Sequence, residues 1–276
     1  MVIFDTSALS ALIKDEQFEP HVKALTCGFD VWLTAMSVDE IIATPVPETR
    51  ETLIVGLQRL LASGRCVWPP HEVLTLMCAA HAGNPKSFDW RTVNIRTTRY
   101  ERAIIDREFT EDLCETQLRE QRSVEEGYME FWQGLRGKLD TFLVAANRPR
   151  RYGEAAEIAR TGKVLSGLGK PLYQRGSGTS LDDDQIKAFM DACPPFRAIC
   201  YGLVGTWYDV SLATQVFKKL AGRNDQMMAV YLPYCSRFVT ADGKQETRLR
   251  EIGEEAKLEC EVLSHTAFLA SFNVLA

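Results

Sequence analysis

The stretch that decides the fold is Val2-Ile3-Phe4-Asp5-Thr6-Ser7-Ala8-Leu9, near the beginning of the 276-residue chain. Its run of β-branched and aromatic residues predicts a short buried strand over residues 2–4. Ser7 can cap a helix with an apolar face, and Asp5 stands between the strand and that helix. A buried strand that passes directly into a helix is typical of an α/β protein with a parallel sheet.

The same alternation recurs on both sides of a long central region. Short apolar runs predict further strands over residues 31–34, 66–68, 237–240 and 260–263. Helical patterns lie between them, for example over residues 72–82, 226–234 and 244–256. Because parallel strands need crossover connections, we expect a mostly parallel sheet with helices on both faces, a three-layer α/β/α sandwich.

The central region has a different pattern, because no strand is evident in it. Two long charged helices are expected over residues 101–121 and 124–146, followed by shorter ones over 181–193 and 195–205. The segment from Thr161 to Asp184 holds five glycines, a composition typical of a flexible loop or lid. We therefore divide the chain into a discontinuous α/β domain, residues 1–82 and 206–276, and a mainly helical insertion, residues 83–205, with a Gly-rich loop at 161–184.

Composition limits the classes of function. The 32 Lys and Arg residues against 37 Asp and Glu give a formal net charge of −5. This balance excludes a protein that binds nucleic acid through bulk positive charge, but not one that uses a local basic patch or a bridging metal. The eight cysteines form no Cys-x-x-Cys pair and lie mostly in apolar runs, so we expect buried free thiols in a reducing compartment. With neither a leader pattern nor a long apolar stretch, we expect a cytoplasmic protein without a membrane span.

Four acids stand at strand ends or helix starts in distant parts of the chain. Asp5 and Asp242 follow predicted strands, whereas Glu40 and Asp225 open helices. Ligands bind outside the carboxyl ends of the strands in an open parallel sheet, so we expect the four carboxylates to converge at one edge. Such a cluster repels itself unless cations are present, and Mg²⁺ or Mn²⁺ fits its oxygen ligands best. A site of this kind can activate water and hold phosphate oxygens during in-line displacement.

Four motifs resemble those of the PIN-domain family of metal-dependent nucleases. Residues 2–9 look like the family's opening strand and first acid, and Thr34-Ala35-Met36-Ser37-Val38-Asp39-Glu40-Ile41 resembles its second motif, which delivers a glutamate. Asn224-Asp225-Gln226-Met227-Met228-Ala229 resembles the third motif, and Phe238-Val239-Thr240-Ala241-Asp242 the fourth. All four occur in the family's order, and the resemblance covers the α/β part but not the insertion.

The resemblance implies a PIN-like sandwich with Mg²⁺- or Mn²⁺-dependent nuclease activity, most often ribonuclease activity. Asp5 would then be the central metal ligand and a catalytic residue, with Glu40 and Asp225 completing the first site. Asp242 would support a second metal or hold the attacking water. Beside these acids, hydroxyl groups could orient a ligand carboxylate or a water; they belong to Thr6, Ser7 and Thr240.

Each acid also has a structural interpretation that stays open. Asp5 and Asp225 could only cap helices, Glu40 could be a solvated first-turn acid, and Asp242 could be a turn residue. Asp39, next to Glu40, could be the ligand in its place.

Two basic clusters are candidates for contacts with an RNA backbone. The denser one is Arg148-Pro149-Arg150-Arg151, and a looser one comprises Arg91, Arg96, Arg99 and Arg102. Phosphate contacts of this kind would hold RNA over an acidic site, although a solvated loop and helix face explain both clusters as well.

Partners and alternative functions follow from the same features. Many small PIN-domain proteins are toxins paired with antitoxins, so the resemblance implies a protein partner such as an antitoxin, although the insertion separates this chain from those compact members. A homodimer is the other assembly that we consider. Two alternative functions stay open: a catalytically inactive PIN-like binding or scaffold protein acting through its helical insertion, and a metal phosphohydrolase acting on a small phosphate ester.

Overall fold

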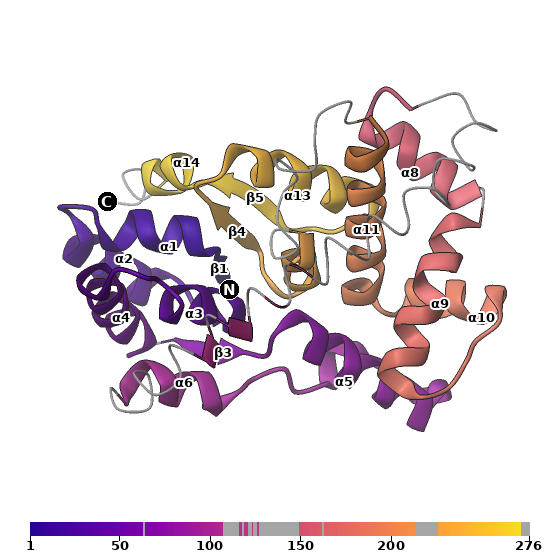
Figure 1. Cartoon of the computed structure of the whole chain (residues 1–276), viewed down its shortest axis with the longest axis horizontal. Helices are drawn as coiled ribbons and strands as arrows, with labels where there is room; N and C mark the ends of the chain where they lie inside the picture. The colour runs from indigo at the N-terminus through magenta and orange to yellow at the C-terminus, as the bar shows by residue number, and fades with distance from the viewer. Residues whose placement is uncertain are drawn as a thin grey trace.

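A computed structural model describes most of the chain (Figure 1). The described residues are 1–62, 64–106, 116–117, 119–120, 123, 126, 149–161, 163–212 and 226–271.

Five parallel strands form one sheet in the described part, in the order β3-β2-β1-β4-β5. The strands are β1 (Val2–Phe4), β2 (Val31–Thr34), β3 (Arg65–Val67), β4 (Arg237–Thr240) and β5 (Glu261–Ser264). The sequence predicted each of them to within one residue, because β-branched and aromatic residues are enriched in strands. β1 pairs with β4 in the register Ile3↔Phe238, so segments more than 200 residues apart in sequence meet at the centre of the sheet.

Helices cover both faces of this sheet, which confirms the layered α/β architecture. The α-helices are α1 (Thr6–Ile13), α2 (Phe18–Gly28), α3 (Ala35–Ile42), α4 (Pro47–Leu61), α5 (Pro70–Gly83), α6 (Thr98–Ile105), α8 (Tyr152–Thr161), α9 (Val164–Ser177), α10 (Asp183–Ala192), α11 (Pro194–Leu212), α13 (Gly243–Glu255) and α14 (His265–Ala270). Within the described ranges they are accompanied by the 3₁₀ helices η1 (Pro85–Ser87), η2 (Trp90–Thr92) and η4 (Met228–Tyr234).

The two faces of the sheet belong to two hydrophobic cores, because side chains alternate along a strand. Val2 and Phe4 of β1 lie in the core formed with α1–α4, α6 and α14. Ile3, between them, lies in the other core, which also contains Phe238 of β4 and residues of α5, α8–α11, α13 and η4. The helices α8–α11 therefore extend one of the two cores of the α/β sheet, and Figure 1 shows them gathered at one end of the molecule beside α5.

Residues 95–105 pack on the α/β part of the fold, although the sequence assigns them to the insertion that begins at residue 83. The amide of Thr97 donates to the carbonyl of Cys66 over 3.0 Å, and the amide of Trp68 donates to the carbonyl of Ile95 over 2.9 Å. α6 then packs on α3, α4 and β3. The division of the chain into two domains stays a prediction.

The prediction of a Gly-rich loop at 161–184 is wrong, because residues 164–177 form α9 and α10 begins at Asp183. Two glycines of α9, Gly169 and Gly176, allow close packing between helices. A Cβ at Gly176 would lie 2.9 Å from the Cβ of Cys78 on α5, and a Cβ at Gly169 would lie 3.1 Å from Cγ1 of Ile186 on α10. α9 then ends at Gly178, whose φ of 73° is favourable for glycine.

Several predicted helix boundaries also differ. The helix expected over 101–121 starts at Thr98 and ends at Ile105, where Asp106 adopts an extended backbone. The expected helix over 124–146 lies almost wholly outside the described residues. The helix expected from residue 226 is the 3₁₀ helix η4, and it contains Pro233, which has no amide proton to donate. Across the described ranges, no helix is both long enough and apolar enough to cross a membrane.

Candidate functional site

The sheet has one topological switch point, between β1 and β4. The chain builds β1, β2 and β3 outward in one direction and then returns to place β4 and β5 on the other side of β1. In open α/β sheets, ligands bind outside the carboxyl ends of the strands at such a point. Asp5 directly follows β1, and Asp242 lies two residues after β4. Two of the four predicted acids therefore lie at the switch point.

Asp5 is buried and held by three donors. The amide of Ala8 donates to Oδ1 over 2.7 Å, and this hydrogen bond caps α1. The hydroxyl of Ser7 lies 2.8 Å from Oδ2, and the hydroxyl of Thr240 at the end of β4 lies 2.9 Å from the same oxygen. The carboxylate thus has a fixed orientation, and its capping role coexists with any role toward a ligand.

The hydroxyls of Ser7 and Thr240 also form hydrogen bonds with the segment that follows β4. The Ser7 hydroxyl accepts a hydrogen bond from the amide of Ala241 over 2.9 Å, and the Thr240 hydroxyl accepts one from the amide of Asp242 over 3.0 Å. Oγ1 of Thr240 lies 2.6 Å from Oε1 of Gln245 as well. Because a hydroxyl carries one proton, Thr240 can donate either to Asp5 or to Gln245 at a given moment. Two of the three predicted hydroxyl residues, Ser7 and Thr240, therefore do lie against Asp5, and Gln245 is a partner that the sequence did not suggest.

Glu40 is the second predicted acid whose charge acts on Asp5, as the smallest of the influences on the pKa of Asp5. Burial raises the pKa of Asp5, hydrogen bonds from Ala8, Ser7 and Thr240 oppose that rise, and the negative charge of Glu40 adds to it. A cation at this point would relieve both the burial cost and the repulsion between the carboxylates. The site is therefore electrostatically suited to a positively charged ligand.

Glu40 lies in the second turn of α3, not in the first turn as the sequence predicted. The helix begins at Ala35 because Thr34, the last residue of β2, caps it by accepting a hydrogen bond from the amide of Ser37 over 3.1 Å. α3 packs against α1, the helix that Asp5 caps. Because the helix dipole acts mainly within the first turn, it favours a carboxylate at the position of Glu40 only weakly.

Asp39 has different surroundings from Glu40. Its Oδ2 accepts a hydrogen bond from the Tyr100 hydroxyl of α6 over 3.3 Å, and its Oδ1 is buried without a partner in the described part of the chain. Burial raises the pKa of Asp39 to about 7, which the hydrogen bond from Tyr100 and the charge of Arg99 only partly oppose. Of the two neighbouring acids, Glu40 is the one whose charge raises the pKa of Asp5, and Asp39 faces α6.

Asp242 is exposed and caps α13. Its Oδ1 accepts hydrogen bonds from the amides of Lys244 over 2.7 Å and Gln245 over 3.1 Å, and no described hydrogen bond uses Oδ2. Asp242 connects to Asp5 through the hydroxyl of Thr240, which bonds to both. Asp242 therefore does act as a turn and capping residue, and its Oδ2 accepts no described hydrogen bond.

Asp225 and Arg148 lie outside the described residues. Thr6 is described, and its hydroxyl oxygen is buried with no partner within the described ranges. Across those ranges, no three His, Cys, Asp or Glu side chains come together as a group that could hold a metal ion. Among the described members of the predicted cluster, the charges of Asp5 and Glu40 interact. Asp242 is linked to Asp5 through hydrogen bonds with the hydroxyl of Thr240.

The basic clusters differ in how far their charges are neutralised. Arg150 and Arg151 are exposed at the start of α8. In the looser cluster, Arg96 forms a salt bridge with Glu101 over 3.1 Å, whereas the exposed Arg99 acts electrostatically on Asp39.

A groove of about 480 Å³ lies at the carboxyl end of β3. It is lined by Trp68, Asn94, Arg96, Thr97, Thr98 and Arg99. Sequence reasoning singled out its two arginines but missed Trp68 and Asn94, which approach them only through the pairing of residues 95–97 with the β3 edge. Because β3, β2 and β1 are parallel neighbours, the groove at the carboxyl end of β3 lies at the same edge of the sheet as Asp5.

No protein-family model, curated protein or solved structure matches the chain.

Proposed function

We propose that the chain is a Mg²⁺- or Mn²⁺-dependent phosphodiesterase that cleaves single-stranded RNA. The observation that carries the proposal is Asp5, a buried carboxylate at the switch point of a parallel sheet with the charge of Glu40 acting on it. The resemblance of the four motifs to those of PIN-domain nucleases supports the same reaction class.

Four carboxylates would hold the metal, those of Asp5, Glu40, Asp225 and Asp242. A divalent cation held by such ligands lowers the pKa of bound water and neutralises charge on phosphate oxygens. The residues fit a hard cation because their donors are oxygens. The unpartnered hydroxyl of Thr6, next to Asp5, is a further oxygen that could bind a water at the site.

The chain's own residues would position the reacting groups. Ser7, Ala8 and Thr240 hold the carboxylate of Asp5 in one orientation, so no reorganisation is needed when a cation binds. Burial raises the pKa of Asp5, and a bound cation would offset this cost of holding the carboxylate charge away from water. Asp242, exposed at the rim, could accept a hydrogen bond from the attacking water through Oδ2.

The groove at the carboxyl end of β3 would take the RNA strand. Arg99 is exposed and has the charge to contact a backbone phosphate, while Arg96 is already paired with Glu101. The half-buried indole of Trp68 offers a surface on which a base could stack. This arrangement explains how an acidic protein could bind RNA without bulk positive charge.

The test is cleavage of a labelled single-stranded RNA with Mn²⁺, comparing the wild type with Asp5→Asn. Asparagine caps helices as well as aspartate does, so this variant keeps the hydrogen bond from Ala8 and loses the negative charge. We expect the rate to fall by at least about 100-fold. Asp182→Asn is the matched control, because Asp182 caps α10 in the same way and should keep full activity.

Equal activity in Asp5→Asn and the wild type would contradict the proposal. Calorimetric titration with Mg²⁺ and Mn²⁺ separates the remaining alternative, since an inactive binding protein with a degenerate site would bind neither ion. Competition between RNA and a chromogenic phosphodiester separates an RNA-cleaving enzyme from one that acts on small phosphate esters.

A further inference from the structure

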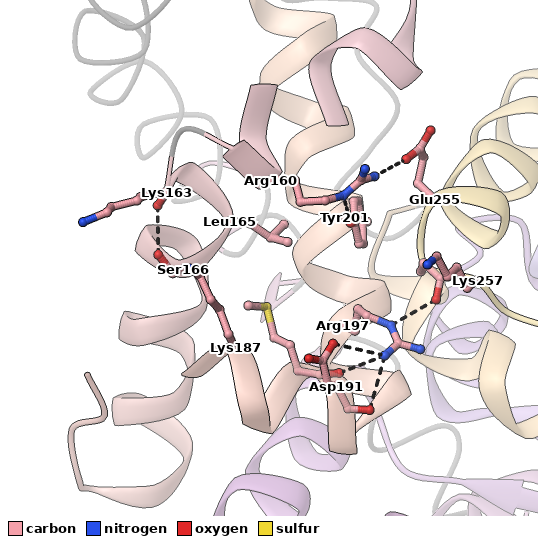
Figure 2. Close-up of a pocket in the computed structure, with 12 residues that line it drawn as sticks. Arg160, Lys163, Leu165, Ser166, Lys187, Asp191, Arg197, Tyr201, Glu255 and Lys257 are labelled. Atoms are coloured by element: carbon pink, nitrogen blue, oxygen red, sulfur yellow. Dashed lines mark hydrogen bonds and ion pairs between the residues drawn. The ribbon is translucent and has the colours of Figure 1, made fainter. Parts of the chain in front are cut away.

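A second candidate site is a cavity of about 340 Å³ between α8, α9, α10, α11 and the end of α13 (Figure 2). Five cationic residues line it, Arg160, Lys163, Lys187, Arg197 and Lys257, against two acids, Asp191 and Glu255. We call it the basic cavity. Its volume lies within the usual range for small-molecule sites, roughly 300–1,000 Å³.

The basic cavity is separate from the acidic edge of the sheet. α13 begins beside Asp242 at that edge and runs for 13 residues to Glu255, which lines the cavity. At about 1.5 Å per residue, the helix places the two sites roughly 20 Å apart. A ligand in the cavity would therefore not touch Asp5 or Glu40.

The cavity is apolar at its base and positively charged at its rim. Leu165, Met190 and Tyr201 line it and are each less than 10% exposed. Lys187 and Lys257, by contrast, are exposed. A ligand that fits both parts has an apolar or aromatic body and an anionic group.

The arginines of the cavity are already held by the protein, whereas two of its lysines are not. Figure 2 shows Arg160 bonded to Glu255 and to the hydroxyl of Tyr201, at 2.6 and 3.2 Å. Arg197 donates to the carbonyl oxygen of Ala256 over 3.0 Å and to the carbonyls that end α10. Lys187 and Lys257 have no acidic partner among the described residues, so their ammonium groups bring uncompensated charge to the rim.

Backbone conformation singles out the same cavity. In the described ranges, the non-glycine residues with positive φ are Lys163, at 60°, and Lys257, at 53°, and both line it. This left-handed region suits glycine and asparagine, and a lysine there is unfavourable. Lys257 follows the C-cap of α13, where the amide of Lys257 donates to the carbonyl of Glu254 over 3.1 Å and the amide of Leu258 donates to the carbonyl of Gly253 over 2.9 Å. Helices commonly end in this way, so the helix termination fixes the backbone of Lys257 at the cavity.

We propose that the basic cavity binds a small organic phosphate monoester with a ring-shaped body. The ammonium group of Lys257 contacts the phosphate, and the ring lies on Leu165 and Met190. This inference does not depend on the nuclease activity proposed above.

The experiment is isothermal titration calorimetry of the full chain with phenyl phosphate and uridine 5′-monophosphate, in EDTA so that the acidic site holds no metal. Phenol and uridine are the uncharged counterparts, and inorganic phosphate lacks the ring. We expect the two monoesters to bind at least about 10-fold more tightly than any of these three.

Lys257→Gly separates binding from folding. Glycine accepts a φ of 53°, so the variant should melt at the same temperature as the wild type or higher, while phosphate-ester affinity falls about 10-fold. Lys257→Arg, which keeps the positive charge, should retain most of the affinity. Lys23→Gln, on the exposed face of α2, is the control that should leave binding unchanged.

Three results would overturn the proposal. They are an absence of monoester binding at millimolar concentration, equal affinity for the uncharged counterparts, and wild-type affinity in a folded Lys257→Gly variant.

Discussion

Two glycines of α9 allow a direct test of how the central helices pack. Gly167 and Gly176 both lie in this helix, but their surroundings differ. A Cβ at Gly167 would meet nothing within 4 Å. A Cβ at Gly176 would lie 2.9 Å from Cβ and 3.1 Å from Sγ of Cys78, and 3.3 Å from Cα of Thr75, all on α5. Alanine should therefore be accommodated at the first position and force α5 and α9 apart at the second.

The magnitudes follow from two opposing effects. Replacing glycine by alanine inside a helix stabilises the fold by about 0.5–1 kcal/mol, because alanine loses less backbone entropy. Overpacking a well-filled helix interface costs about 1–3 kcal/mol. Gly167→Ala should accordingly raise the free energy of unfolding, and Gly176→Ala should lie about 1–3 kcal/mol below Gly167→Ala, since the helix-propensity gain is common to both.

Urea unfolding followed by circular dichroism at 222 nm measures both variants, and equal m-values would validate the comparison. If residues 161–184 were instead a flexible loop, as their composition suggests, the two substitutions would have similar small effects. Equal stability of the two variants would therefore refute the packing of α9 on α5.

Two further predictions concern titrating groups. The folded-state pKa of Asp39, raised to about 7 by burial, exceeds its unfolded value of about 3.8, so its contribution to stability is complete below pH 3.8 and is lost as the pH rises toward 7. Between pH 5 and 8 in EDTA, urea unfolding should show a loss of up to about 3 kcal/mol that Asp39→Asn lacks, and parallel pH profiles would contradict this. Burial raises the pKa of Cys66, Cys78 and Cys193 to about 12, whereas Cys27 is exposed. Cys27→Ser should thus remove one equivalent from the rapid reaction of the native chain with Ellman's reagent at pH 8, and an unchanged rapid phase would argue against this assignment.

The strands and the position of Asp5 could be predicted from the sequence because their signals are local. Val2-Ile3-Phe4 and Arg237-Phe238-Val239-Thr240 are short apolar runs followed within two residues by an acid, and a parallel sheet brings such ends to one edge. The effect of the Glu40 charge on the pKa of Asp5 was predictable for the same reason, because α3 starts at the end of β2, the strand next to β1.

Other features could not be predicted because they depend on contacts between distant segments. The glycines of α9 indicated a loop, and only the close approach of α5 and α10 favours a helix there. The contact of Asp39 with Tyr100 joins residues 61 positions apart. The left-handed backbone of Lys257 has no sequence signal at all, since lysine is a common helix and loop residue.

The central claim, that the acidic edge of the sheet binds a divalent metal, is tested most directly by a crystal structure of the chain soaked in Mn²⁺, with anomalous diffraction to locate the ion. Our account predicts manganese at the carboxyl ends of β1 and β4, bound by Asp5 and Glu40 at roughly 2.0–2.2 Å, with Asp225 or Asp242 completing the site. Carboxyl groups of Asp5 and Glu40 that remain without manganese at saturating concentration would contradict it.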